Sequence, residues 1–171
     1  MRFKRKFYGM KYLILDLETN TKRYLGRKAS FLCNDIVAYS VKATKVQVTK
    51  YIDTTKDLYN LAMIPEINDV GVLVGHNIKF DLLYLWNFSD FQRWLSGGGR
   101  IFDTSLAEYM LTGQRHKYPS LRDIAVNKYG CQPREKLMEK YWDRGIDTKD
   151  IPQELVLEDV KNDVLDTERS C

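Results

Sequence analysis

Two carboxylates, Asp16 and Glu18, lie one residue apart at the end of a short apolar run, residues 12–15. The run has the length and composition of a β-strand, and alternate strand side chains share a face, so both carboxylates emerge on one side. Two like charges there repel, and a divalent cation with oxygen ligands would turn that repulsion into binding. An ordinary solvated strand end is the alternative, since Asp166 and Glu168 repeat the spacing within a predicted helix.

A second pair of polar residues, Asn77 and Asp81, lies where an apolar run, residues 70–75, gives way to a predicted helix. Side chains at such a junction are fixed beside the cleft at the strand ends. Both residues also have a purely structural interpretation. Asparagine is a common helix cap, and an acid in the first turn is favoured by the helix dipole.

The third candidate, Asp163, lies in the last predicted helix, one turn after Asp159. It borders the apolar stripe formed by Leu157, Val160 and Val164. A carboxylate beside a buried stripe is costly unless a partner compensates its charge, although a solvated helix acid stays possible as a simpler interpretation.

The elements needed to position these residues follow from hydrophobic periodicity and turn residues. Strands are predicted over residues 12–15, 35–42, 46–52 and 70–75. Helices are predicted over residues 55–67, from 78 to about 88, through 107–111, over 120–130 and over 152–168, with a flexible stretch at 96–100. Strands first, then strands alternating with helices, indicate an α/β layered domain around a mixed sheet, and we expect one domain over residues 1–171.

The chain has 171 residues, 44% hydrophobic and 12% aromatic, which is enough for a buried core. Its three cysteines are far apart and odd in number, so neither a disulfide framework nor a zinc cluster is indicated. No apolar run reaches the length of a membrane span, and the basic start lacks the hydrophobic segment of a secretory signal. We expect a soluble, cytoplasmic protein whose net charge of +4 is compatible with a polyanionic partner.

Three motifs, in order, resemble the exonuclease motifs of the DEDD superfamily, which is typified by the proofreading domains of DNA polymerases. They are Asp16-Leu17-Glu18-Thr19, Asn77-x-x-Phe80-Asp81, and Asp163 on a late helix. Further segments resemble the exonuclease domain of phage-type family A polymerases: Asp103-Thr104, residues 118–121, Tyr141-Trp142, residues 146–148 and residues 151–152. The resemblance covers nearly the whole chain from about Tyr12 onward.

This resemblance implies a ribonuclease H-like (DnaQ-like exonuclease) fold, with a mixed sheet flanked by helices. It also implies metal-dependent 3′-to-5′ hydrolysis that releases nucleoside monophosphates from single-stranded DNA ends, with RNA as an alternative substrate. The cofactors would be two divalent cations, Mg²⁺ or Mn²⁺, whose charge four carboxylates can offset. A DNA polymerase module outside this chain is an implied partner, and the implied location is phage or bacterial cytoplasm.

The resemblance assigns a metal role to each acid of the motifs. Asp16 would bridge both cations, Glu18 and Asp163 would complete the site of the cation on the nucleophile side, and Asp81 would hold the second cation through water.

The same resemblance assigns the terminal nucleotide to a pocket lined by Asn77 and Phe80. The backbone from Leu17 to Thr19 would contact the sugar of that nucleotide. Phe80 has a simpler interpretation, because an aromatic residue at this spacing is commonly part of the core.

One departure from the pattern concerns the residue that positions the attacking water. The superfamily has a tyrosine four residues before the last aspartate or a histidine five before it, whereas this chain has Asp159 and Glu158 there. Asp159 lies on the same helical face as Asp163, so it could act as an unusual base or an extra ligand. Alternatively, the tyrosine was lost together with the activity, and the chain is a nucleic-acid-binding module without turnover. A further alternative is that the tyrosine was replaced deliberately to trap a complex. We expect metal binding, with an activity between slow and normal.

Overall fold

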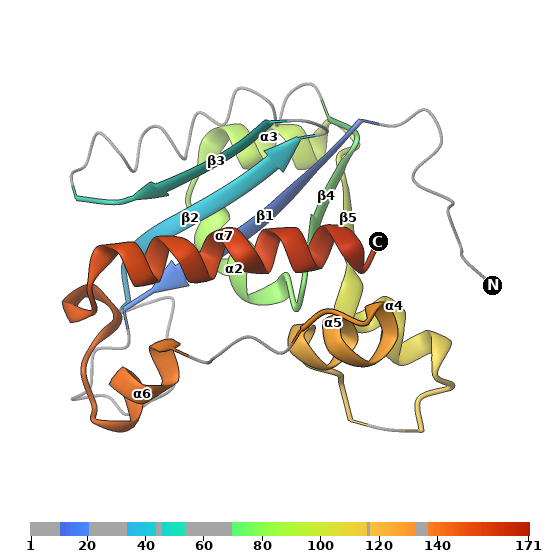
Figure 1. Cartoon of the computed structure of the whole chain (residues 1–171). Helices are drawn as coiled ribbons and strands as arrows, with labels where there is room; N and C mark the ends of the chain where they lie inside the picture. Colours follow the sequence, from blue (N-terminus) through green and yellow to red (C-terminus); the bar gives the residue numbers. More distant parts are fainter. Residues whose placement is uncertain (1–10, 21–33, 44–45, 54–69, 116, 133–136) are drawn as a thin grey trace.

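The computed structural model describes residues 11–20, 34–43, 46–53, 70–115, 117–132 and 137–171 of the chain (Figure 1). Every structural statement below concerns these residues. The helix predicted over residues 55–67 lies outside them.

The described strands form one five-stranded sheet, in the order β3-β2-β1-β4-β5. The strands are β1 (Tyr12–Thr19), β2 (Ile36–Ala43), β3 (Val46–Tyr51), β4 (Val72–Gly75) and β5 (Arg100–Asp103). β1 pairs antiparallel with β2 and parallel with β4, while β2 pairs antiparallel with β3 and β4 parallel with β5. The predicted mixed sheet is therefore confirmed, and β1 is longer than predicted, so that both of its acids lie within the strand.

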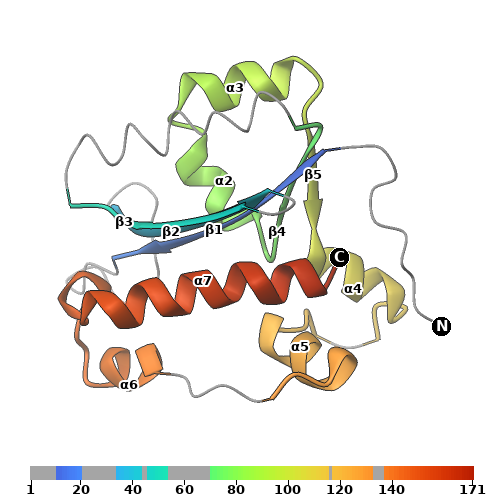
Figure 2. The same cartoon turned by 45° about the horizontal axis from the view of Figure 1, so that its top comes forward.

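The sheet separates two layers of helices (Figure 2). The long helix α7 (Gln153–Arg169) lies along one face, and α2 (Lys79–Leu85) and α3 (Ser89–Ser96) lie on the other. Beyond α7, on the side away from the sheet, are α5 (Leu121–Tyr129) and α6 (Leu137–Asp143), while α4 (Thr104–Leu111) follows β5. This is the arrangement of a sheet flanked by helices that the sequence predicts.

The apolar stripe of α7 explains why this helix lies on the sheet. Val156, Val160 and Val164 recur at helical spacing and are fully buried. Val160 packs in a cluster with Ala38 of β2, and Val164 packs with Ile14 of β1. Burial of each such side chain stabilises the fold by about 1.5–3 kcal/mol. The acids at the border of the stripe are thereby held close to β1.

One prediction about local structure was wrong. The helix expected from residue 78 to about 88 is two helices, because α2 ends at Leu85 and Phe88 is extended, with φ −102° and ψ 124°, before α3 begins. The stretch expected to be flexible, residues 96–100, connects α3, which ends at Ser96, to β5, which begins at Arg100, through a turn at residues 97–99. The pattern of large apolar residues continues across the break because α2 and α3 both pack on the same core, with Leu85 and Trp94 in one cluster.

Helix α5 agrees with the helix predicted over residues 120–130. Ser120 accepts a hydrogen bond from the Asp123 amide at 3.1 Å, and Gly130 ends the helix in the left-handed conformation, with φ 67°.

In the described part of the chain, no helix combines the length and the apolar character needed to cross a membrane.

Gly75 provides a test of how tightly the sheet holds the start of α2. A Cβ at Gly75 would lie 2.8–3.0 Å from three atoms of the Ile78 side chain, whereas a Cβ at Gly71, at the other end of β4, would meet only the Lys11 carbonyl at 3.9 Å. We therefore expect Gly75→Ala to lower the free energy of unfolding by about 1–3 kcal/mol, measured by urea denaturation. Gly71→Ala is the matched control and should change it little; equal effects of the two variants would contradict this packing.

Candidate active site

Strand β1 directs its two acids toward α7. Ile14, two residues before Asp16, packs against Val164 of α7, and alternate residues of a strand share a face, so Asp16 and Glu18 lie on the α7 side. Both are partly buried. The strand continues past its last parallel pair, Ile14 with Val74, so the edge of β1 toward β4 is open beside the acids.

Asp81 occupies that open edge. It lies in the first turn of α2, is 3% exposed, and its Oδ1 accepts a hydrogen bond from the Leu17 amide at 3.1 Å. Leu17 lies between Asp16 and Glu18 in the strand. This bond therefore joins two residues 64 positions apart and fixes the Asp81 carboxyl beside the residue that separates the two acids of β1.

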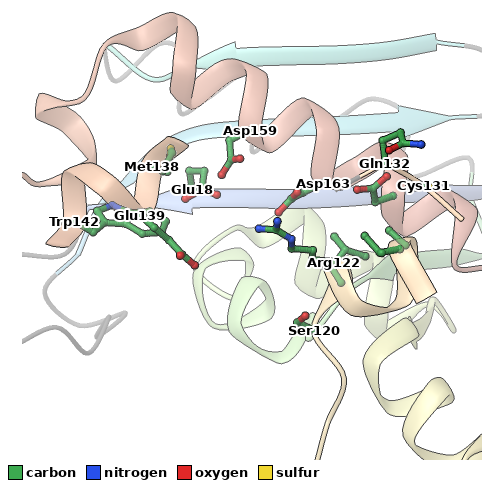
Figure 3. A pocket seen from close by; sticks show the side chains of 14 residues that line it. Glu18, Ser120, Arg122, Cys131, Gln132, Met138, Glu139, Trp142, Asp159 and Asp163 are labelled. Atoms are coloured by element: carbon green, nitrogen blue, oxygen red, sulfur yellow. The ribbon is translucent and has the colours of Figure 1, made fainter. Parts of the chain in front are cut away.

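Asp159 and Asp163 complete the acidic group from α7, where each precedes a buried valine of the stripe, Val160 and Val164. In Figure 3, Asp159 points toward Glu18, and Asp163 lies farther along the helix. Asp159 and Asp163 are both partly buried. The helix thus brings two more carboxyls to the face of β1 that carries the first pair.

The pKa values show that these five carboxyls form one interacting cluster. Burial raises the pKa of Asp16 well above its ordinary value, and Asp81, Asp163, Glu18 and Asp159 raise it further. Burial likewise raises the pKa of Glu18, with added contributions from Asp159, Asp163 and Asp81. Burial raises the pKa of Asp81 to about 8, against the opposing hydrogen bond from the Leu17 amide.

The residues expected around a terminal nucleotide lie near the start of α2 and in β1. Asn77 is exposed, has φ 52°, and its amide donates to the Asp103 carboxylate at 3.0 Å. It does not cap α2, whose N-cap is Ile78. Phe80 is partly buried and its ring lies 5.2 Å from that of Tyr84. Leu17 and Thr19 are buried, and the Leu17 amide is already bonded to Asp81.

The acidic cluster offers the oxygen ligands of a divalent-cation site, but they are not arranged to coordinate a cation. Within the described ranges, no group of three or more His, Cys, Asp or Glu side chains is arranged so that it could hold a metal ion. The donors are nevertheless carboxylate oxygens, which hard cations prefer, and their mutual repulsion is what a cation would relieve. Cation binding would require these side chains to draw closer together.

A cavity of about 310 Å³ opens beside the cluster, between β1, α5, α6 and α7 (Figure 3). Glu18, Asp159 and Asp163 belong to its wall, and facing them are Arg122 of α5 and Glu139 of α6. The Arg122 guanidinium points toward Asp163 in Figure 3. Carboxylates outnumber this arginine, so the wall repels a phosphate ester until cations are bound.

Arg122 and Glu139 in this wall were not predicted from the sequence, and Trp142 was named only as part of a resemblance. One signal for Arg122 was available: a cation in the first turn of a helix opposes the helix dipole, which suggests a compensating negative partner. Glu139 and Trp142 lie on α6, a helix that was not predicted. Asp166 belongs to the second acid pair at this spacing, which supported the simpler interpretation. It is buried, lines the cavity and pairs with Arg169 at 2.7 Å.

The raised pKa of Asp81 predicts a pH-dependent stability. A folded-state pKa of about 8 means that the folded chain binds this proton more tightly than the unfolded chain, so stability falls as pH rises from about 4 to about 8. Asp81→Asn keeps an oxygen for the Leu17 amide and removes the charge. In EDTA at pH 8 we expect it to raise the free energy of unfolding by on the order of 2 kcal/mol, with a smaller gain at pH 4.

Asp90→Asn, in α3, is the control for that measurement because Asp90 pairs with Arg93 away from the cluster. It should show no such pH-dependent gain. A loss of stability in Asp81→Asn at pH 8 would contradict the electrostatic account.

No family model matches this chain, but it is similar to DNA polymerases. The chain is 36% identical over 90 residues to DNA polymerase I of Aquifex aeolicus, a match that covers 50% of this chain and 14% of that protein. Its structure matches the family B DNA polymerase of the hyperthermophilic archaeon Pyrobaculum calidifontis with a TM-score of 0.61 and 20% identity, over 94% of this chain and 24% of that one.

The chain thus spans a small part of the length of each of these polymerases. The expected α/β, ribonuclease H-like fold is confirmed by the mixed five-stranded sheet and by its match in a polymerase structure.

Proposed function

We propose that this chain forms a 3′-to-5′ exonuclease domain that uses divalent cations to release nucleoside monophosphates from single-stranded DNA ends. The observation that carries the proposal is the convergence of five carboxyls from β1, α2 and α7, seen in the raised pKa values of Asp16 and Glu18, to which Asp81, Asp159 and Asp163 contribute. A folded protein keeps such a costly group of like charges where function requires it. The likeness to DNA polymerases supports a role in processing nucleic acid, with proofreading beside a polymerase module as the expected setting.

Asp16, Glu18, Asp81 and Asp163 are the proposed ligands. When bound, a pair of Mg²⁺ or Mn²⁺ ions would activate water and stabilise the charge on the leaving 3′ oxygen. The raised pKa values mean that cations and protons compete for these carboxyls, so cation affinity should increase with pH. The Leu17 amide holds Asp81 in place for this role.

Asp159 is proposed to accept the proton of the attacking water, in place of the tyrosine or histidine that the resemblance leads one to expect. It lies on the cavity wall and points toward Glu18, so it adjoins the proposed nucleophile side (Figure 3). Arg122, on the opposite wall, is placed to balance phosphate charge once cations occupy the cluster.

The cavity size supports a single terminal nucleotide as the bound group. A volume of about 310 Å³ lies at the lower end of the range for small-ligand pockets. Asn77 and Phe80, with the backbone of Leu17 and Thr19, remain the proposed contacts to that nucleotide, and they lie outside the wall of this cavity.

Asp159 also favours a second candidate, a module that binds single-stranded nucleic acid without cleaving it. A carboxylate at the water-positioning place adds negative charge where the resemblance predicts a neutral or positively charged ring. Cleavage with Mn²⁺ separates the two candidates.

The direct test is cleavage of a 5′-labelled single-stranded DNA in Mn²⁺. We expect stepwise shortening that stops in EDTA, and a loss of about 10²–10⁴ in rate for Asp16→Asn, because the bridging carboxylate charge is removed. Glu154→Gln, an exposed acid of the same α7 that carries Asp163, should cleave at the wild-type rate. Trimming that continues in EDTA, or none in Mn²⁺, contradicts the proposal. A matched RNA strand decides the alternative substrate.

The role of Asp159 has its own test. Asp159→Asn keeps the shape of the side chain but cannot accept a proton, so we expect the rate of cleavage to fall about 10²–10⁴-fold. Binding of Mn²⁺, followed by calorimetry, should persist, because four carboxylates remain. A cleavage rate that is unchanged or faster in this variant would assign the proton transfer to another group.

A further inference from the structure

Two tyrosines outside the cavity stack on each other, Tyr109 partly buried and Tyr118 exposed. The rings of Tyr109, in α4, and Tyr118, in the segment before α5, have centroids 4.3 Å apart and planes 19° apart. Tyr118 is 60% exposed although one face of its ring is covered by Tyr109. The other face of the Tyr118 ring is therefore available to a further flat group.

The surroundings of this stack are apolar and basic. Leu106 and Met110 share a helical face with Tyr109 and are 46% and 56% exposed. Arg115 and Lys117 are exposed beside Tyr118. The sequence between Glu108 and Asp123 contains no acidic residue, in contrast to the cavity wall.

The tyrosine stack lies only two residues along the chain from the cavity. Tyr118 is two residues before Ser120, which lines the cavity, so their Cα atoms are at most about 7.6 Å apart. That distance is about two rises of a stacked nucleotide strand, at 3.4 Å each. Ser105, in the first turn of α4, donates to the Pro119 carbonyl at 3.5 Å and so keeps this segment against the helix.

Two further contacts hold α4 in place beside the proposed nucleotide pocket. The Asp103 carboxylate accepts from the amide of Ser105 at 2.9 Å and from that of Asn77 at 3.0 Å. Glu108 of α4 pairs with Lys128 of α5. The stack is therefore carried on a support that also contacts the turn before α2.

We propose that Tyr109 and Tyr118, with Arg115 and Lys117, form a stacking platform for single-stranded nucleic acid upstream of the terminal nucleotide. A base stacks on the open face of Tyr118, and the two cations contact the backbone phosphates. Exposed aromatic rings flanked by cations are the usual means of binding single strands without sequence preference. The direction of the bound strand rests on the proposed function, since its 3′ end would run from the platform into the acidic cavity.

A binding measurement in EDTA tests the platform without cleavage. The probe is a 5′-fluorescein oligothymidylate of about twelve nucleotides, followed by fluorescence anisotropy. We expect Tyr118→Ala to weaken binding about 5- to 20-fold, and Tyr118→Phe to bind as the wild type does, because stacking requires the ring and not the hydroxyl. Tyr129→Ala is the matched control, since Tyr129 is an exposed tyrosine of α5 beside Lys128, and it should bind normally.

Two further readouts separate stacking from charge. On an abasic strand of the same length, Tyr118→Ala and the wild type should bind equally, because the strand has no bases to stack. Replacing Arg115 and Lys117 by glutamine should lower the slope of log affinity against log salt by about 0.7 for each lost phosphate contact, whereas Tyr118→Ala should leave the slope unchanged.

Several outcomes would overturn the platform: absence of binding by the wild type, equal losses in the Tyr118→Ala and Tyr129→Ala variants, or a Tyr118→Ala variant that binds oligothymidylate normally. The last result would leave this face to a protein partner. Circular dichroism of each variant confirms folding, and Tyr118→Leu, which keeps apolar area without a ring, should lose affinity as the alanine variant does. If the predicted pattern appears but Mn²⁺ produces no cleavage, the platform stands and the exonuclease proposal fails.

Discussion

The hydrogen bond from the Leu17 amide to Asp81 is the contact on which the candidate site depends. It exists because β4 stops pairing with β1 at Ile14, which leaves backbone donors of β1 exposed beside the acids. A carboxylate in the first turn of α2 then satisfies one of these donors. The bond that satisfies this backbone donor of β1 therefore also holds a third carboxyl beside the strand that carries the first two.

Gathering five carboxyls is unfavourable in the absence of cations, because burial and mutual repulsion both oppose ionisation. The apolar stripe of α7 opposes this cost. Its three fully buried valines press the helix onto β1 and β2, so that Asp159 and Asp163 cannot move away while the helix stays packed. Stability from the core thus maintains an arrangement that is electrostatically strained, which is common where charge serves chemistry.

The surface around the cluster has two parts of opposite charge, the acidic wall of the cavity and the basic segment of chain that leads to it. The wall of the cavity carries Glu18, Asp159 and Asp163 opposite Arg122, whereas the segment leading to it carries Arg115 and Lys117 with the exposed Tyr118. A polyanion would be attracted by the basic segment and repelled by the wall of the cavity. Cations bound at the wall would remove that repulsion and couple strand binding to metal binding.

The sequence by itself determined the features that depend on neighbours in the chain. The alternation of β1 put Asp16 and Glu18 on one face, the stripe of α7 put Asp163 at its border, and Ser120 and Gly130 marked the ends of α5. Only the tertiary structure decided the Leu17–Asp81 bond, the break between α2 and α3, the presence of Arg122 and Glu139 in the cavity, and the tyrosine stack. These features arise from contacts between distant segments, and local periodicity carries no information about such contacts.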